Sequence, residues 1–169
     1  LSPALHTRWL ERYGINGHYG AMAVLPGHLK QALDMLRNRG DAGCNLTIPH
    51  KEDAMPLMDD HDESAVMSGA VNTVVIQDGQ LIGYNSDGFG FVEGLKAAAP
   101  NWAGQRVAVL GCGGAARGII ASLRGAMGVK SFALINRTRA KAERIVKQFT
   151  LENSTVFEWH AREEALAGA

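Results

Sequence analysis

Apolar residues in the first half of the chain recur at helical spacing in some stretches and at strand spacing in others. Helices are predicted for 1–14, 26–40 and 49–58. In the first of these, Ser2 suits the N-cap, Pro3 the first helical position and Gly14 the C-terminal stop. Gly40 ends the second helix in the same way.

Strand-like stretches lie between these helices. They are "HYGAMAV" (18–24), "AGCNLT" (42–47) and two strands within 70–87. The last two strands are joined by Asp78-Gly79, a dipeptide typical of a two-residue hairpin turn. The acidic run at 58–64 is interpreted as a solvated loop. Strands alternating with helices predict an α/β fold.

The second half of the chain alternates one strand with one helix. The predicted elements are a helix at 87–99, a strand at 107–110, a helix at 115–124, a strand at 132–135 and a helix at 138–149. Between the first two, "PNWAGQ" (100–105) is typical of an inter-domain joint. We therefore expect two domains: a substrate-binding α/β domain at 1–87, a linker helix and joint at 88–105, and a Rossmann-like domain at 106–169. The last domain has about half the usual length, so we expect it to be incomplete.

The composition disfavours several classes of function. The chain has 169 residues, of which 46% are hydrophobic, enough for a sizeable core. Lys plus Arg and Asp plus Glu both number 17, so the formal net charge is zero and neither nucleic acid nor an anionic membrane is expected as a partner. No apolar run approaches ~18 residues and no signal peptide is visible, which predicts a cytoplasmic protein.

Cysteine and histidine usage argues against disulfide and metal chemistry. Cys44 and Cys112 are predicted to be free thiols, because nothing in the sequence indicates export. The six histidines show no His-x-x-x-His spacing and the cysteines no Cys-x-x-Cys spacing, so no metal site is predicted.

The segment "GCGGAA" (111–116) fits the dinucleotide fingerprint G-x-G-x-x-G/A, with a predicted strand before it and a helix after it. Gly111 permits a tight turn, Gly113 lets the backbone approach a pyrophosphate, and Ala116 allows close helix–strand packing. The free N–H groups at the helix start would bind the anion, whereas the alternative is a purely structural turn. The candidate cofactor-binding residues here are Gly111, Gly113, Gly114, Ala115 and Arg117.

The end of the second strand indicates which dinucleotide binds. NAD-binding units carry Asp or Glu there to bind the ribose 2′-hydroxyl, but this chain has "NRTRAK" (136–141). Arg137 can hold a 2′-phosphate in a charge-assisted pair, which favours NADP over NAD. Basic residues at a helix N-terminus oppose its dipole, so a phosphate explains them better than simple solvation does. The candidates are Asn136, Arg137, Thr138 and Lys141.

Three polar clusters in the first half follow predicted strands. They contain Asn45, Thr47 and Lys51, then Asn72, then Asp87. Ligands of open α/β sheets bind at strand ends, so these side chains are expected to meet at one site. Singly, each also has a structural reading as a cap, turn or surface residue. Together they suit a small polyhydroxylated acid.

The motifs "LSPALH", "NLTIPHK", "GAVNTVV", "YNSDG", "GCGGAAR" and "NRT" resemble, in this order, those of shikimate dehydrogenases. The resemblance covers nearly the whole chain and implies NADP-dependent, reversible reduction of 3-dehydroshikimate to shikimate in aromatic amino acid biosynthesis. It implies that Ser2 contacts the substrate carboxylate and that Lys51 and Asp87 form the catalytic pair. The substrate hydroxyls would be bound by Asn45, Thr47, Asn72 and Asp87.

The expected chemistry agrees with these residue types. Hydride transfer to a ketone places negative charge on oxygen, which an ammonium can stabilise or protonate. Lys51 can serve either as the proton donor or as an electrostatic stabiliser, with Asp87 orienting it and keeping it charged.

Several alternatives stay open at this level. The family pattern has a strand and a second serine before Ser2 and continues beyond residue 169, so a fragment is expected. Other readings are a quinate/shikimate dehydrogenase of broader specificity and a catalytically incompetent NADP-binding fragment. Both a monomer and a homodimer are compatible with the sequence.

Overall fold

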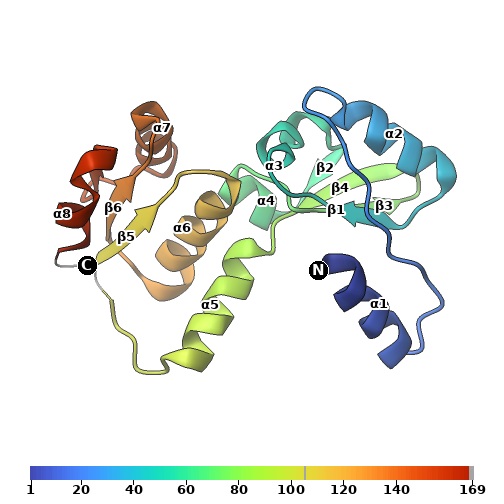
Figure 1. Cartoon of the computed structure of the whole chain (residues 1–169), viewed down its shortest axis with the longest axis horizontal. Helices are drawn as coiled ribbons and strands as arrows, with labels where there is room; N and C mark the ends of the chain where they lie inside the picture. Colours follow the sequence, from blue (N-terminus) through green and yellow to red (C-terminus); the bar gives the residue numbers. More distant parts are fainter. Residues whose placement is uncertain (105, 168–169) are drawn as a thin grey trace.

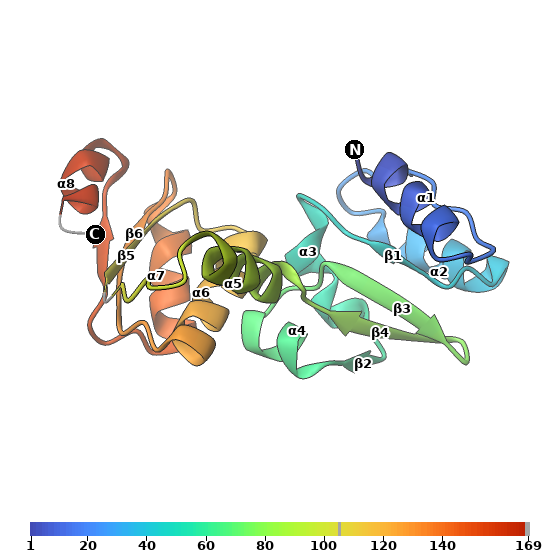
Figure 2. The same cartoon turned by 90° about the horizontal axis from the view of Figure 1, so that it is seen from below.

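The computed structural model describes residues 1–104 and 106–167, and it divides the strands between two separate sheets. Figures 1 and 2 show these sheets toward opposite ends of an elongated molecule, with α5 (Asp87–Ala98) and α6 (Gly114–Met127) between them. Gln105, the last residue of the predicted joint, and residues 168–169 lie outside the described residues.

The first half is a small mixed sheet with helices around it. Its elements are α1 (Ser2–Arg12), α2 (Leu29–Arg39), β1 (Gly43–Asn45), α3 (His50–Asp53), a 3₁₀ turn (Met55–Leu57), β2 (Asp60–His61), α4 (Glu63–Ser68), β3 (Thr73–Gln77) and β4 (Gln80–Tyr84). The strand order is β1-β3-β4-β2, with β2 parallel to β4 and the other pairs antiparallel. The predicted hairpin is confirmed: Asp78 and Gly79 have φ of 52° and 77°, as a two-residue primed turn requires.

The register of this sheet gathers polar residues at one end. Thr73 pairs with Asn45 on one side and with Tyr84 on the other. The residues that precede Thr73 and those that follow Tyr84 therefore leave the sheet at the same end. A core of buried aliphatic residues from α2, α4, β3 and β4, including Leu33, Val74 and Leu81, lies behind them.

The second half is a parallel βα repeat. Its elements after α5 are β5 (Arg106–Leu110), α6, β6 (Ser131–Ile135), α7 (Arg139–Phe149), β7 (Thr155–Phe157), a 3₁₀ turn (Trp159–Ala161) and α8 (Arg162–Leu166). The order β5-β6-β7 is that of one half of a doubly wound nucleotide-binding sheet. The central strand β6 is covered on both faces, by α6 and α7 on one and by Ala165 of α8 on the other. The α/β prediction is thus confirmed, and each sheet has its own core.

Helices α5 and α6 cross with their backbones in contact. A methyl group on Gly88 would lie 2.1 Å from the carbonyl oxygen of Gly118, a distance that no real side chain tolerates. Glycine at both positions therefore allows the crossing. This contact joins α5, which begins at Asp87, to α6, which begins at the end of the glycine-rich segment 111–114, called the glycine turn below.

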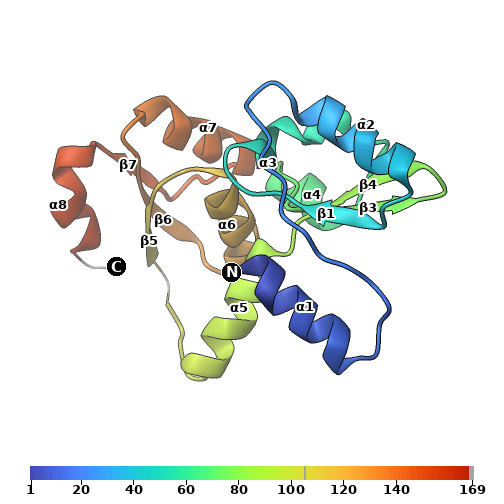
Figure 3. The same cartoon turned by 45° about the vertical axis from the view of Figure 1, so that its right-hand side comes forward.

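Three local predictions were wrong. Residues 18–24 form no strand: they run as an extended segment from α1 toward α2 (Figure 3), because no neighbouring strand pairs with them. Ser2 lies inside the first turn of α1, and Leu1 occupies the N-cap position. The run at 58–64 is not a simple loop, since it contains β2 and the start of α4, where Asp62 accepts a capping bond from the backbone N–H of Ser64.

None of the helices within the described residues has both the length and the apolar composition that a membrane span requires.

Candidate functional site

Lys51 and Asp87 form an ion pair where the first sheet meets α5. Lys51 Nζ donates to Asp87 Oδ2 at 2.6 Å, and the two side chains are only 14% and 22% exposed. Lys51 lies on α3, whose position is fixed by a bond from the backbone N–H of Val71 to the Lys51 carbonyl at 2.8 Å. Asp87 is the first residue of α5, where the positive end of the helix dipole favours a carboxylate.

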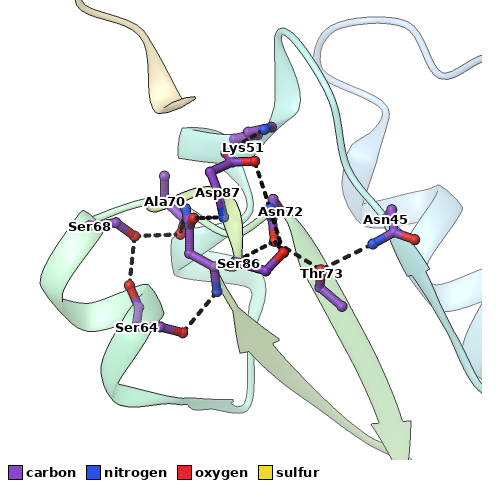
Figure 4. A network of polar contacts seen from close by, with 10 residues as sticks. Asn45, Lys51, Ser64, Ser68, Ala70, Asn72, Thr73, Ser86 and Asp87 are labelled. Carbon is purple, nitrogen blue, oxygen red and sulfur yellow. Dashed lines mark hydrogen bonds and ion pairs between the residues drawn. The ribbon is translucent and has the colours of Figure 1, made fainter. Parts of the chain in front are cut away.

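Asn72 holds the other oxygen of this carboxylate. Its Nδ2 donates to Asp87 Oδ1 at 2.8 Å, and the residue is 8% exposed. Its Oδ1 accepts from the backbone N–H of Ser86 at 3.1 Å and from the hydroxyl of Thr73 at 2.8 Å. Asp87 therefore has both oxygens engaged and a defined orientation (Figure 4).

The network continues across the sheet to Asn45. Asn45 Nδ2 donates to the hydroxyl of Thr73 at 3.0 Å, and the hydroxyl of Tyr19 donates to Asn45 Oδ1 at 2.9 Å. The structure thus connects three of the predicted substrate-binding side chains, Asn45, Asn72 and Asp87, through hydrogen bonds (Figure 4).

Other members of the predicted set are placed differently. Ser2 lies at the start of α1, and Thr47 lies between β1 and α3, where its carbonyl accepts from the N–H of His50. Within residues 1–104 and 106–167, neither hydroxyl joins the network around Asp87. Their roles stay predictions.

Three network members were missed by reasoning from the sequence. Thr73 and Ser86 adjoin predicted residues within the motifs "VNTVV" and "NSD", so adjacency was the available signal. Tyr19 belongs to the segment wrongly predicted as a strand, and nothing in its neighbourhood pointed to Asn45. Burial of its hydroxyl raises the pKa of Tyr19, so this group is a neutral donor at physiological pH.

The glycine turn faces Lys51 across a cavity of about 300 Å³. The cavity is lined by Ile48, Pro49, Lys51, Glu52, Gly111, Cys112, Gly113, Gly114, Asn136 and Lys141. Gly111 has φ of 99°, and side-chain atoms added at Gly111 or Gly113 would meet open space, so this backbone is accessible to a ligand. Gly114 begins α6 and lies so close to Lys51 that an added methyl group would be 3.0 Å from the lysine Cβ.

Asn136 joins this turn to the end of β6. Its Oδ1 accepts from the backbone N–H of Cys112 at 3.1 Å, and its Nδ2 donates to the carbonyl of Thr138, the N-cap residue of α7. Burial raises the pKa of the Cys112 thiol to about 11, so the thiol is uncharged. Like Cys44, it is a free thiol.

The basic residues beyond this point have different partners. Arg137 lies over the ring of Trp159, with its guanidinium carbon 5.4 Å from the ring centroid. Arg139 instead pairs with Glu143 at 2.7 Å and Glu158 at 2.8 Å. Among the described residues, Arg137 has no carboxylate partner, so its charge is available to a ligand.

Arg117 and Ala115 complete the predicted cofactor residues. Ala115 is the exposed second residue of α6. The guanidinium of Arg117 forms an ion pair with Glu52, at 3.5 Å, and a hydrogen bond with Gln148. It therefore links α3 of the first half to α6 and α7 of the second.

Comparison with known proteins covers both halves of the chain. Residues 1–74 match the family model described as the shikimate dehydrogenase substrate binding domain, and residues 93–169 match that of shikimate / quinate 5-dehydrogenase. The NADP(+) shikimate dehydrogenases of Paracoccus denitrificans and Rhodospirillum rubrum are 42% and 45% identical over 99% of this chain. The chain spans about 60% of the length of the curated relatives it matches.

Solved structures agree with this similarity. Shikimate dehydrogenase from Aquifex aeolicus is 34% identical with a TM-score of 0.83, covering 93% of this chain and 57% of its own. The Thermus thermophilus enzyme, solved with NADP(H) and shikimate, is 37% identical with a TM-score of 0.80, covering 91% and 57%. Quinate dehydrogenase from Corynebacterium glutamicum, solved with NAD, is 29% identical with a TM-score of 0.84, covering 99% and 62%.

Proposed function

The chain belongs to the shikimate dehydrogenase family, and on that premise we propose that it catalyses the reversible, NADP-dependent reduction of 3-dehydroshikimate to shikimate. The observation that carries the proposal is the Lys51–Asp87 pair, held at 2.6 Å beside a glycine turn that is accessible across a cavity. An acid–base pair and a dinucleotide-binding turn at one site are the requirements of a dehydrogenase.

The hydroxyl groups of the substrate would be bound by the network around Asp87. Asn45, Asn72 and Asp87 present amide and carboxylate groups whose positions are fixed by their mutual hydrogen bonds. A polyhydroxylated ring suits such a surface because each hydroxyl can both donate and accept. Ser2 and Thr47, which lie outside the network around Asp87, are proposed to contact the substrate because of the family resemblance.

Lys51 would act on the carbonyl oxygen of the substrate. As the ketone is reduced, negative charge develops on this oxygen, and a positioned ammonium stabilises that charge and can supply the proton. Asp87 restricts Lys51 to one orientation, so little reorganisation is needed during the reaction. Both groups are more than three-quarters buried, which strengthens their electrostatic effect.

The residues of the second half fit NADP. The accessible backbone at Gly111 and Gly113 and the start of the 14-residue helix α6 would hold the pyrophosphate. Arg137, with its charge available, would pair with the 2′-phosphate, helped by Asn136, Thr138 and Lys141. When bound, the reduced nicotinamide supplies the hydride.

A comparison of turnover and binding tests the proposal. The purified chain is mixed with NADP and shikimate, and NADPH formation is followed at 340 nm. In separate reactions, quinate replaces shikimate and NAD replaces NADP. We expect turnover with shikimate and NADP in the wild type and loss of turnover in Asp87→Asn. The control Asp34→Asn, which alters a surface pair with Lys30, should turn over shikimate like the wild type.

Two outcomes would replace the proposal. Faster turnover of quinate than of shikimate would indicate the broader quinate/shikimate activity. NADP binding, measured by calorimetry, without turnover of either acid would indicate an incompetent cofactor-binding fragment.

A cytoplasmic location is part of the proposal. The free thiols Cys44 and Cys112 are typical of a reducing compartment, which supports it. The proposed partners are small molecules, namely the substrate and NADP. A net charge of zero lacks the basic excess typical of proteins that bind nucleic acid.

A further inference from the structure

Asn85 is a buried polar residue that none of the roles above uses. It is 5% exposed and lies two residues before Asp87, between β4 and α5. Buried amides are found with their hydrogen-bonding groups satisfied, and the partners of Asn85 show what it holds together.

The side chain of Asn85 joins the start of α5 to the loop between α4 and β3. Its Oδ1 accepts from the backbone N–H of Asp87 at 3.0 Å, and its Nδ2 donates to the carbonyl of Ala70 at 2.9 Å. Ala70 lies two residues before Asn72, the residue that holds the Asp87 carboxylate. Both the backbone and the carboxylate of Asp87 are therefore set from the same short segment.

The same amide oxygen lies against α6. A methyl group on Gly118 would be 2.8 Å from Asn85 Oδ1, closer than side chains approach. Gly118 is one turn into the helix whose first residue, Gly114, borders the cavity. Asn85 thus lies between the acid of the ion pair and the helix of the glycine turn.

We propose that Asn85 is a positioning residue, which fixes Asp87 relative to both Asn72 and α6, and hence the substrate side of the site relative to the cofactor side. The inference rests on the proposed dehydrogenase function. Among the described residues, Asn85 forms no hydrogen bond with Lys51 and is not part of the cavity lining, so its effect on the reaction passes through Asp87.

A purely structural role is the competing explanation, and Ser68 provides the matched control. Ser68 is also buried, at 1% exposure, and its hydroxyl lies 2.9 Å from the same Ala70 carbonyl (Figure 4). If Asn85 only supports Ala70, Asn85→Ala and Ser68→Ala will both lower stability and leave kcat alone.

The experiment compares two pairs of variants in the whole chain. Asn85→Ala is compared with Ser68→Ala. Gly118→Ala, which presses on the amide oxygen without removing it, is compared with Gly125→Ala, whose methyl group would find only Met67 at 3.8 Å. We measure kcat, KM for NADP, and the ¹³C resonance of the Asp87 carboxyl carbon.

Asn85→Ala and Gly118→Ala should each lower kcat by about tenfold or more, since small misplacements of a catalytic group have large effects. KM for NADP should stay within about twofold of wild type, and the Asp87 resonance should shift in these two variants alone. An unshifted resonance, or equal kcat in Asn85→Ala and Ser68→Ala, would overturn the proposal. If the wild type turns over no substrate, the dehydrogenase function fails, and the resonance still decides whether Asn85 positions Asp87.

Discussion

The contact between Gly88 and Gly118 allows a quantitative prediction about stability. In Gly88→Ala, the new methyl group would lie 2.1 Å from the carbonyl oxygen of Gly118 and 2.2 Å from Oγ of Ser122. Ordinary contact begins at 3.4 Å, so the helices would have to separate by about 1.3 Å. The obstructing atom belongs to backbone inside α6, so it cannot move aside alone.

The expected loss follows from two opposing contributions. Overpacking costs about 1–3 kcal/mol, and an immovable backbone atom places this case near the upper value. Replacing glycine by alanine inside a helix contributes about 0.5–1 kcal/mol of stabilisation. We therefore expect Gly88→Ala to lower the free energy of unfolding by about 2 kcal/mol.

Urea unfolding followed by circular dichroism measures this difference, and Gly90→Ala is the matched control. Gly90 lies in the same helix, and a methyl group there would meet nothing within 4 Å, so Gly90→Ala should stabilise the chain by about 0.5–1 kcal/mol. If Gly88→Ala is as stable as Gly90→Ala, the close crossing of α5 and α6 does not exist in solution.

Lys51→Ala should lower kcat by about 10²–10⁴-fold and change KM for shikimate far less, because the ammonium acts on charge that develops during the reaction; steady-state kinetics that leave kcat within about threefold would rule this out. Arg137→Asp should lower the ratio of kcat/KM for NADP over NAD by at least about tenfold, whereas Arg139→Asp, which alters a residue already paired with glutamates, should change it little. Burial raises the pKa values of Cys44 and Cys112 to about 11, from 9.0 in an exposed thiol. The thiols of the unfolded chain therefore lose their protons at lower pH than those of the folded chain. The free energy of unfolding should consequently fall as the pH rises from 9 to 11. The variant with alanine at both positions should lose less stability over this range in urea titrations; an identical loss would contradict the assignment.

The second half of the chain was predictable because its signals are local. The glycine turn, the strand before it and the helix after it are adjacent in sequence, and β5, α6, β6 and α7 formed within a few residues of their predicted bounds. The hairpin at Asp78-Gly79 was predictable for the same reason, since two positive φ angles define its turn.

The first half was less predictable where an element depends on a distant partner. The apolar residues of 18–24 favoured a strand, but a strand exists only where a neighbouring edge accepts its hydrogen bonds, and within the described residues no edge pairs with this segment. Tyr19 within this segment instead contacts Asn45, 26 positions away. No periodicity in the sequence carries that information.

The sequence by itself determined which chemical groups this protein has and on which kinds of element they lie: an ammonium after a strand, a carboxylate at a helix start, and glycines before a helix. Only the tertiary structure decided that Lys51 and Asp87, 36 positions apart, share one hydrogen bond at 2.6 Å. The register of β1, β3 and β4 brought the polar strand ends together, and the glycines at the α5–α6 crossing allowed the two halves to approach. Side-chain chemistry is a property of single residues, whereas the distance between two side chains depends on the packing of all the elements between them.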